Sequence, residues 1–344
     1  MDIESKSRNT FIIAEAGVNH NGSLDLAIEL CNKAKEVGAD AIKFQTWITS
    51  KIIVKGTPQA LYQQKNTKKN IDQYTLLQKL ELSFREFEEI NKHCKSLDLK
   101  FLSTPDDLES LNFLIDKIGL DIIKIGSGEV TNIPFLRKIG ELSTKVILST
   151  GMCNIKDIEI AVKALGYPKE EDLIILHCTS SYPCDYKYAN LNVINTLKKI
   201  FNYEIGFSDH TLGITASIGA VALGAKVIEK HFTLDKSMPG PDHLCSLEPN
   251  EFKDMVNQIR ILERSLGENN KTIQDVEKDT REKVIKKILA STSIKKGDIF
   301  DSQNITLLRS ADGQLNGQNW DNIIGKRSKR EYKKNQFIYI DEID

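Results

Sequence analysis

The chain has 344 residues, of which 40% are hydrophobic and 28% are charged, and its formal net charge is −1. This length exceeds one ordinary small domain, and the balanced charge argues against a nucleic-acid-binding protein. The longest apolar stretch, 218–227, is interrupted by Gly219, Gly224 and Lys226, so we expect no membrane span.

The first residues, 1–6, are polar, and an apolar run follows soon after them. Such a beginning is unlike a signal peptide. The six cysteines are scattered without a CxxC pair, which indicates reduced thiols. We therefore expect a cytoplasmic protein.

Eight strand-like runs alternate with helix-like segments along most of the chain. The runs are 11–14, 41–44, 100–102, 122–125, 145–148, 173–176, 204–207 and 226–228. Between them, apolar residues recur with a helical period, as in 24–37 and 84–97. Helix caps are expected at Ser23, at Ser83 with Glu86, and at Asp106 or Asp107. This alternation predicts an α/β fold with a parallel sheet, and eight strands close a (β/α)8 TIM barrel.

The pattern changes after Glu268. We expect a TIM-barrel domain over 1–268, a polar linker over 269–283 and a small β-rich domain over 284–344. The β-like pieces of the last part are 288–294, 299–300, 305–308 and 337–340, with a turn at 295–298. A unit of roughly 60 residues is near the lower limit for independent stability.

Polar and ionisable residues follow the predicted strands. Four of the six histidines lie in such clusters, namely His20, His177, His210 and His231. A parallel barrel brings its strand ends together at the C-terminal mouth, where catalytic residues are typically found. We therefore expect the chemistry to lie at this mouth.

One set of these residues suits an anion. Lys43 and Lys124 supply positive charge, and hydroxyls and glycine-flanked amides can donate hydrogen bonds to a phosphate or carboxylate. The hydroxyls are those of Ser127, Ser149, Thr150 and Ser208, and the glycines are Gly126, Gly128 and Gly151. For any single hydroxyl a helix N-cap is the simpler interpretation, but the whole set favours anion binding.

A second set suits a metal ion. His210 and His231 end neighbouring strands, with Asp209, Glu229 and Asp242 near them in the sequence. Two imidazoles completed by carboxylate or water leave open positions on a divalent ion, as Lewis-acid catalysis on a carbonyl requires. The alternative for each histidine is a packed, hydrogen-bonded side chain.

Two glutamates and two neutral polar residues complete the candidate site. Glu15 and Glu129 follow strands and could move protons or orient a sugar hydroxyl, although a salt bridge to a nearby lysine is the ordinary alternative. Gln45 and Tyr182 could bind a polyol, while Tyr182 followed by proline also fits a structural turn.

At this point the motifs resemble those of a known family, the bacterial sialic acid synthases (N-acetylneuraminate synthase and its legionaminic and pseudaminic acid relatives). The matching segments are 15–23, 43–46, 103–105, 124–129, 148–152, 178–183, 206–211, 229–233 and 240–242. The resemblance covers essentially the whole chain, and the C-terminal part is similar to the family's antifreeze-like (SAF) domain.

The resemblance implies condensation of phosphoenolpyruvate with an N-acetylmannosamine-type aldose, release of phosphate and a need for Mn²⁺ or Mg²⁺. It implies that His210 and His231 hold the metal and that Glu129 or Glu15 handles protons. The implied phosphoenolpyruvate ligands are Lys43, Thr104, Lys124, Ser127, Ser149 and Ser208, and the implied sugar contacts are Gln45, Tyr182 and Asp242.

The resemblance also implies a homodimer with a swapped C-terminal domain, in which an arginine matching Arg309 enters the partner's site. Three departures from the family concern sugar specificity more than chemistry. Ser310 follows the arginine where proline is frequent, Asp106 replaces an aromatic residue, and Ser180, which we count as substrate-binding, stands where some members have Asn.

Two other functions remain open. A Schiff-base aldolase would use Lys124 or Lys43 as its nucleophile, and a non-enzymatic carbohydrate-binding protein could use the C-terminal domain. The identity of the aldose also stays open, and we expect a loop over 62–78 to determine it. We expect an uncharged sugar, because no basic cluster appears beyond the phosphoenolpyruvate set, although Lys65, Lys68 and Lys69 in that loop leave a sugar phosphate open.

Overall fold

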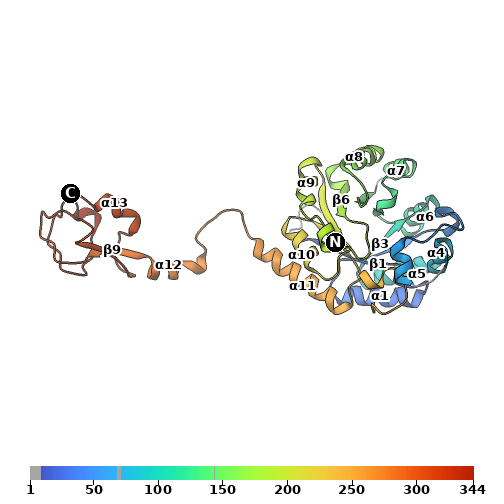
Figure 1. Cartoon of the computed structure of the whole chain (residues 1–344), viewed down its shortest axis with the longest axis horizontal. Helices are drawn as coiled ribbons and strands as arrows, with labels where there is room; N and C mark the ends of the chain where they lie inside the picture. The colour runs from blue at the N-terminus through green and yellow to red at the C-terminus, as the bar shows by residue number, and fades with distance from the viewer. Residues whose placement is uncertain (1–8, 68–70, 143) are drawn as a thin grey trace. The chain divides into compact units, whose positions relative to one another are not determined.

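The computed structural model describes residues 9–67, 71–142 and 144–344 (Figure 1). The polar segment 1–6, Lys68 and Lys69 therefore lie outside the described residues, as does the side chain of Lys65. The chain divides into two compact units, one ending at Gly267 and one from Glu268 to Asp344. We describe each unit by itself.

The first unit is a parallel barrel of eight strands, which confirms the predicted fold class. The strands are β1 (Phe11–Gly17), β2 (Ala41–Thr46), β3 (Lys100–Pro105), β4 (Ile122–Ile125), β5 (Lys145–Ser149), β6 (Leu173–Cys178), β7 (Glu204–Asp209) and β8 (Val227–His231). Their order in the sheet is β3-β2-β1-β8-β7-β6-β5-β4, and the end strands β3 and β4 are neighbours. Several strands run further than predicted, so that Glu15, His177 and His231 lie within strands.

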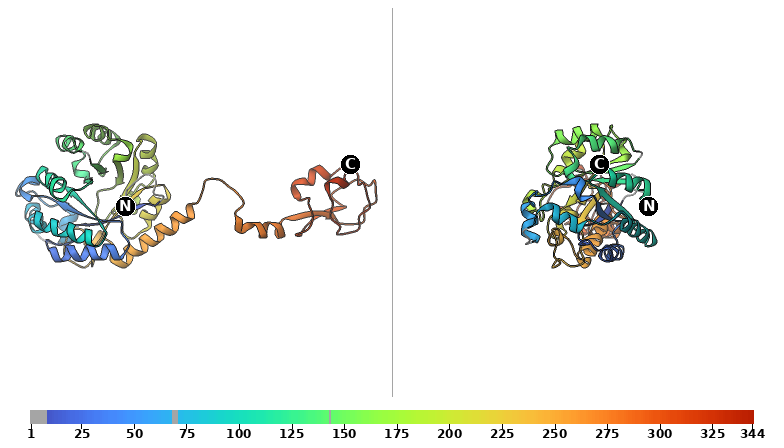
Figure 2. Two further views of the ribbon diagram at one scale, coloured as in Figure 1. Left: turned by 180° about the vertical axis from the view of Figure 1, so that it is seen from behind. Right: turned by 90° about the vertical axis from the view of Figure 1, so that its right-hand side faces the viewer.

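Helices surround the barrel, and most of them cover its outside (Figure 2). They are α1 (Leu24–Glu36), α2 (Thr49–Ile52), α3 (Leu61–Thr67), α4 (Gln73–Leu80), α5 (Phe84–Ser96), α6 (Leu108–Phe113), α7 (Ile133–Gly140), α8 (Ile155–Ala164), α9 (Val193–Ile200), α10 (Thr215–Ala222) and α11 (Pro249–Leu266). The predicted caps are confirmed at Ser23 and at Ser83 with Glu86, and Asp107 rather than Asp106 caps α6. No helix of the described residues is long and apolar enough to cross a membrane.

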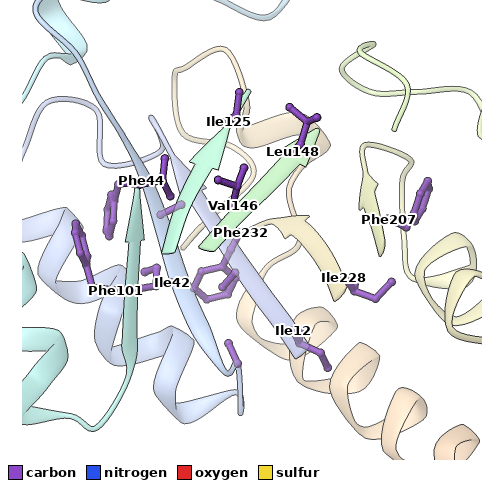
Figure 3. Packing of buried hydrophobic residues seen from close by; sticks show 14 of the residues in the cluster. Ile12, Ile42, Phe44, Phe101, Ile125, Val146, Leu148, Phe207, Ile228 and Phe232 are labelled. Atoms are coloured by element: carbon purple, nitrogen blue, oxygen red, sulfur yellow. The ribbon is translucent and has the colours of Figure 1, made fainter. Parts of the chain in front are cut away.

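The outer faces of the strands pack against the helices through apolar side chains, including Ile12, Phe44 and Ile228 (Figure 3). The inner faces form two successive layers, because alternate residues of a strand point to the same side. An apolar layer consists of Ile13, Ala41, Leu102, Ile122, Ile147, Ile174, Leu176 and Val227. A polar layer follows towards the carboxyl ends of the strands and consists of Glu15, Lys43, Thr104, Lys124, Ser149, Ser208 and Glu229.

The segment expected as a loop over 62–78 is largely helical, so the expectation of a loop was wrong, whereas its role in determining the aldose stays a prediction. It contains α3 and α4. The carboxylate of Asp72 accepts a hydrogen bond from the backbone N–H of Thr75 and so caps α4, a short-range signal that barrel periodicity does not reveal.

The second unit is small and has a core of its own. Its regular elements are α12 (Lys278–Val284), β9 (Lys286–Ala290), β10 (Ile305–Arg309) and α13 (Trp320–Ile323), and β9 pairs with β10 in antiparallel fashion. The core includes Ile288, Phe300 and Tyr332. β9 ends at Ala290, earlier than predicted, because Ser291 turns the chain and donates a hydrogen bond to the Gln303 carbonyl. The antifreeze-like character and the linker over 269–283 stay predictions.

Candidate active site

A cavity of about 560 Å³ opens at the carboxyl ends of the barrel strands. Most of the predicted site residues meet on its wall. They are Glu15, Lys43, Gln45, Thr104, Lys124, Ser127, Ser149, Ser180, Tyr182, Ser208, His210 and His231. The floor of the cavity is the polar layer, which explains why residues from different strands converge there.

Two buried lysines lie in the floor. The Nζ atom of Lys43 donates a hydrogen bond to Oγ1 of Thr104 at 3.1 Å, and Nζ of Lys124 donates one to Oγ of Ser149 at 2.7 Å. Burial lowers the pKa of Lys124. Burial would also lower the pKa of Lys43, but Glu15 and Glu229 outweigh it and raise that pKa. Lys43 is therefore a fixed positive charge at neutral pH.

Glu229 joins the two lysines, whereas the sequence had suggested it only as a carboxylate near the proposed metal ligands. Its carboxylate lies 3.5 Å from Nζ of Lys124 and 3.7 Å from Nζ of Lys43, and it accepts a hydrogen bond from Oγ of Ser208 at 2.8 Å. Burial would raise the pKa of Glu229, but the two lysines outweigh burial and lower it to about 2. The sequence held a signal for Glu229, since it precedes His231 by two residues and so shares its face of the strand.

Glu15 is the second carboxylate of the floor. Its Oε2 lies 2.7 Å from Nζ of Lys43, and its Oε1 is 3.5 Å from Nε2 of Gln45. Burial outweighs the attraction of Lys43 and raises the pKa of Glu15 to about 7. A carboxyl group with such a pKa can both donate and accept a proton near neutrality.

The two histidines face each other across one side of the cavity, with ring centroids 5.5 Å apart. The Nδ1–H group of His210 donates to the Thr179 carbonyl at 2.7 Å, which leaves Nε2 facing the cavity. Nδ1 of His231 is buried without a hydrogen-bond partner in the described part of the chain, and the Asp242 carboxylate lies 3.9 Å away. Burial lowers the pKa of both rings, so both are neutral imidazoles.

Neutral imidazoles can coordinate a metal. Within residues 9–67, 71–142 and 144–344 no group of three or more His, Cys, Asp or Glu side chains is arranged to hold an ion. A metal at His210 and His231 would therefore need substrate or water to complete its coordination, which is an arrangement that leaves positions open for catalysis.

Serine side chains pack closely around Gly151. Its N–H donates a hydrogen bond to Oγ of Ser127 at 2.9 Å. A Cβ atom at this position would lie only 2.2 Å from Oγ of Ser180, so a side chain here would displace the serines that line the cavity.

Four predicted site residues are not on the cavity wall. Thr150 is buried and its hydroxyl donates to the Leu176 carbonyl at 2.8 Å, and the Glu129 carboxylate accepts from Asn132 at 2.6 Å. The Asp242 carboxylate lies 3.9 Å from Nδ1 of His231, and Arg309 ends β10 in the second unit, where it is exposed. Sequence spacing could not distinguish these positions from those on the wall.

The wall also includes residues that the strand pattern did not predict. Tyr62 of α3 and Gln73 of α4 are among them, and the Tyr62 ring lies 5.0 Å from that of Tyr182. Asp106 at the end of β3 is another, and burial followed by repulsion from Glu129 raises its pKa to about 7.

Only two of the four histidines that follow or end predicted strands reach the cavity. His177 contacts the Ala189 carbonyl at 2.8 Å through Nε2. Nδ1 of His20 accepts a hydrogen bond from the N–H of Gly22 at 3.1 Å. His20 and His177 are therefore packed, hydrogen-bonded side chains. This was the alternative to metal binding that we gave for a histidine.

Comparison with known proteins gives a consistent result. The NeuB family model matches residues 30–271. The N,N'-diacetyllegionaminic acid synthases of Campylobacter jejuni and Legionella pneumophila are 44% and 42% identical, over 96% and 93% of this chain and 99% and 91% of those proteins. The crystal structure of the N-acetylneuraminic acid synthetase of Leptospira borgpetersenii, in complex with citrate, is 35% identical with a TM-score of 0.70, and the match covers 80% of this chain and 90% of that one.

Proposed function

The chain belongs to the NeuB family, and we propose that it condenses phosphoenolpyruvate with an N-acetylmannosamine-type aldose to a nine-carbon sialic acid, releasing phosphate. Membership confirms the resemblance seen in the sequence and the expectation of an enzyme, and it leaves a non-enzymatic carbohydrate-binding protein without support. Because two similar relatives are named N,N'-diacetyllegionaminic acid synthase, we propose legionaminate ahead of N-acetylneuraminate as the product.

One observation carries this proposal: two buried lysines and two buried histidines line the same cavity. Lysines with hydroxyl donors suit the phosphate and carboxylate of phosphoenolpyruvate. Neutral imidazoles suit a divalent metal. A cavity of this size can hold ligands such as phosphoenolpyruvate and a sugar.

The residues present fit a divalent cation, for which His210 and His231 are the proposed ligands. The buried Nδ1 of His231 lacks a partner among the described residues, and Nε2 of His210 faces the cavity. Imidazole suits transition metals better than Mg²⁺, which prefers oxygen ligands, so Mn²⁺ is the first ion to test. When bound, the cation would polarise the aldehyde of the open-chain sugar.

The polar layer supplies charge and protons in the proposed reaction. Lys43 and Lys124 offset the charge of phosphoenolpyruvate while its C3 forms a bond to the aldehyde carbon. Water then adds to C2, and the tetrahedral carbon expels phosphate. We assign proton transfer to Glu15 rather than Glu129, because Glu15 lines the cavity and has a pKa of about 7.

The residues that line the cavity outside the polar layer favour an uncharged sugar as the substrate. It includes Ala60, Tyr62 and Met152, and on the described lining Lys43 and Lys124 are the only basic side chains apart from the histidines. We assign both lysines to phosphoenolpyruvate, so among the described lining residues a sugar phosphate would find no basic partner of its own. Apolar side chains suit the methyl group of a 6-deoxy aldose.

We further propose a homodimer in which Arg309 of one subunit enters the cavity of the other. An exposed arginine at the end of β10 can bind a carboxylate bidentately. Mixing an Arg309→Ala subunit with a Lys124→Met subunit should restore activity to part of the population, because one of the two sites regains both residues. Since all six cysteines are free thiols, we propose the cytoplasm as the compartment.

The test is phosphate release from phosphoenolpyruvate and Mn²⁺ with N-acetylmannosamine, its 6-phosphate and the 2,4-diacetamido-2,4,6-trideoxy sugar in turn. We expect release with the diacetamido sugar and no release after EDTA treatment. Release with another of these sugars would correct the product. No release with any of them from the folded protein would overturn the proposed reaction.

A second candidate is a Schiff-base aldolase with Lys124 as nucleophile, because burial lowers the pKa of this lysine as such an enzyme requires. Borohydride treatment in the presence of a carbonyl substrate distinguishes the aldolase from the synthase. Covalent trapping on Lys124 would favour the aldolase, and the synthase predicts none.

A further inference from the structure

Behind the candidate active site, a lysine and an aspartate form an ion pair that solvent does not reach. The Nζ atom of Lys230 lies 3.0 Å from Oδ2 of Asp209, and both side chains are fully buried. The two residues are ladder partners of β7 and β8. Because successive side chains of a strand point to opposite faces, the pair faces the helices while Ser208 and Glu229 face the cavity.

Each member of the pair immediately precedes a candidate metal ligand. His210 follows Asp209 and His231 follows Lys230. The residues at the ends of both strands therefore follow the same sequence pattern. A residue that faces the cavity comes first, a member of the ion pair comes second, and a histidine of the cavity wall comes third. Movement of the pair would displace both histidines.

The pair also fixes the main chain beyond His210. The Asp209 carboxylate accepts hydrogen bonds from the N–H and the Oγ1 of Thr211, each at 2.8 Å, and from Oγ of Ser217 at 2.6 Å. The Nζ atom of Lys230 donates to the carbonyl oxygen of Thr211. The residues on both sides of His210 are thus tied to one buried cluster.

His231 depends on its backbone even more than His210 does. The His210 ring is oriented by its own hydrogen bond to the Thr179 carbonyl. The Nδ1 atom of His231 has no such partner within the described residues, and its nearest carboxylate, that of Asp242, is 3.9 Å away. The position of this ring is therefore set by packing and by the main chain next to Lys230.

A contribution to the stability of the fold does not explain the ion pair well, because replacement of a buried ion pair by apolar residues is often neutral or stabilising. We propose that Asp209 and Lys230 are positioning residues that hold His210 and His231 at the separation a divalent cation requires. This inference rests on the proposed function, since it concerns the metal of that reaction. Groups behind metal ligands typically change metal affinity by about 10–100-fold when they are replaced.

The test uses the full chain with the double substitution Asp209→Asn and Lys230→Met, which removes both charges without leaving one of them buried alone. Mn²⁺ binding is measured by electron paramagnetic resonance, and the visible spectrum of bound Co²⁺ reports coordination geometry. We expect the Kd for Mn²⁺ to rise by about 10-fold or more and the Co²⁺ spectrum to change. Phosphoenolpyruvate affinity without metal should stay near that of the wild type, because Lys43 and Lys124 are untouched.

A matched control is Asp40→Asn, which breaks the partly buried pair between Asp40 and Arg260, 3.0 Å apart, near the amino ends of the strands. It should lower Tm and leave the Kd for Mn²⁺ unchanged. If the double variant behaved like this control, the positioning role would be overturned and the pair would be structural only. If the wild type itself bound no Mn²⁺, the metal part of the proposed function would fall, and the inference with it.

Discussion

The two interior layers of the barrel are built by the same strands, two residues apart, and they differ in almost every physical respect. The apolar layer, for example Ile13 and Leu102, buries aliphatic surface and so favours folding. The polar layer buries Glu15, Lys43, Lys124 and Glu229. Burial of charged groups is unfavourable unless they are paired, and these groups pair at 2.7–3.7 Å. Stability and chemistry are therefore separated along each strand.

Removing a charge from the polar layer should have the largest effect. Lys124→Met deletes the cation that bonds to Ser149 and pairs with Glu229. We expect kcat/KM for phosphoenolpyruvate, measured by phosphate release, to fall by roughly 10²–10³-fold, as when other fixed electrostatic groups are removed. The exposed Lys138→Met on α7 should leave kcat/KM unchanged. A fully active Lys124→Met would show that the polar layer does not bind the substrate.

Removing volume from the apolar layer should affect stability instead. Leu102→Ala opens a cavity in the barrel interior, so the free energy of unfolding in urea should drop by about 2–5 kcal/mol. The kcat/KM of the folded protein should change far less than for Lys124→Met. The exposed Leu266→Ala is the control and should leave the free energy of unfolding nearly unchanged. A loss of activity without a loss of stability at Leu102 would break the distinction between the layers.

The pH dependence of stability should identify an ionisable group at the edge of the polar layer. The pKa of Asp106 is raised to about 7, whereas it is about 3.9 in an unfolded chain. Between these pH values the folded protein holds a proton that the unfolded chain has released, so the contribution of Asp106 to stability falls as the pH rises through this range. Asp106→Asn should make the free energy of unfolding less dependent on pH there.

The exposed Asp275→Asn is the control for this measurement and should keep the pH dependence of the wild type. An Asp106→Asn variant with an unaltered pH dependence would mean that Asp106 titrates normally.

The smallest effect should come from the wall outside both layers. Tyr62→Ala removes a ring that lies 5.0 Å from that of Tyr182. Aromatic pairs contribute about 0.5–1.5 kcal/mol, so KM for the sugar should rise by roughly 2–10-fold, with KM for phosphoenolpyruvate unchanged. Leu61→Ala, an exposed neighbour on α3, should change neither constant. An equal rise in both KM values would place Tyr62 at a shared part of the cavity.

The barrel could be predicted well because the alternation of strands with helices and the spacing of apolar residues are local signals in the sequence. The same period of two predicted the convergence of Lys43 and Lys124, and it could have added Glu229. It could not separate Ser149, which faces the cavity, from Thr150, whose hydroxyl bonds to the Leu176 carbonyl. Adjacent residues at a strand end have similar chemistry, and only the three-dimensional structure tells their directions apart.

Such reasoning named the segment 62–78 as the one facing the sugar, but it could not identify the individual residues that reach the cavity from there. Tyr62 lies on α3, which was expected to be a loop, and its approach to Tyr182 is a tertiary contact. Glu129 was chosen because it follows β4, but the short helical turn 127–129 directs its carboxylate to Asn132. In both cases local geometry after the strand, rather than the strand itself, determines the direction of the side chain.

The pairing of Glu15 and Glu229 with the two lysines has a thermodynamic consequence. When Glu15 is ionised, two cations and two anions balance, so an arriving anion must compete with both carboxylates for Lys43 and Lys124. A cation at the neighbouring histidines would attract the same carboxylates and free the lysines for the anion. Binding of either ion should thus strengthen binding of the other, and linkage requires the two enhancements to be equal. The two lysines and two glutamates would thus couple the binding of two ligands of opposite charge.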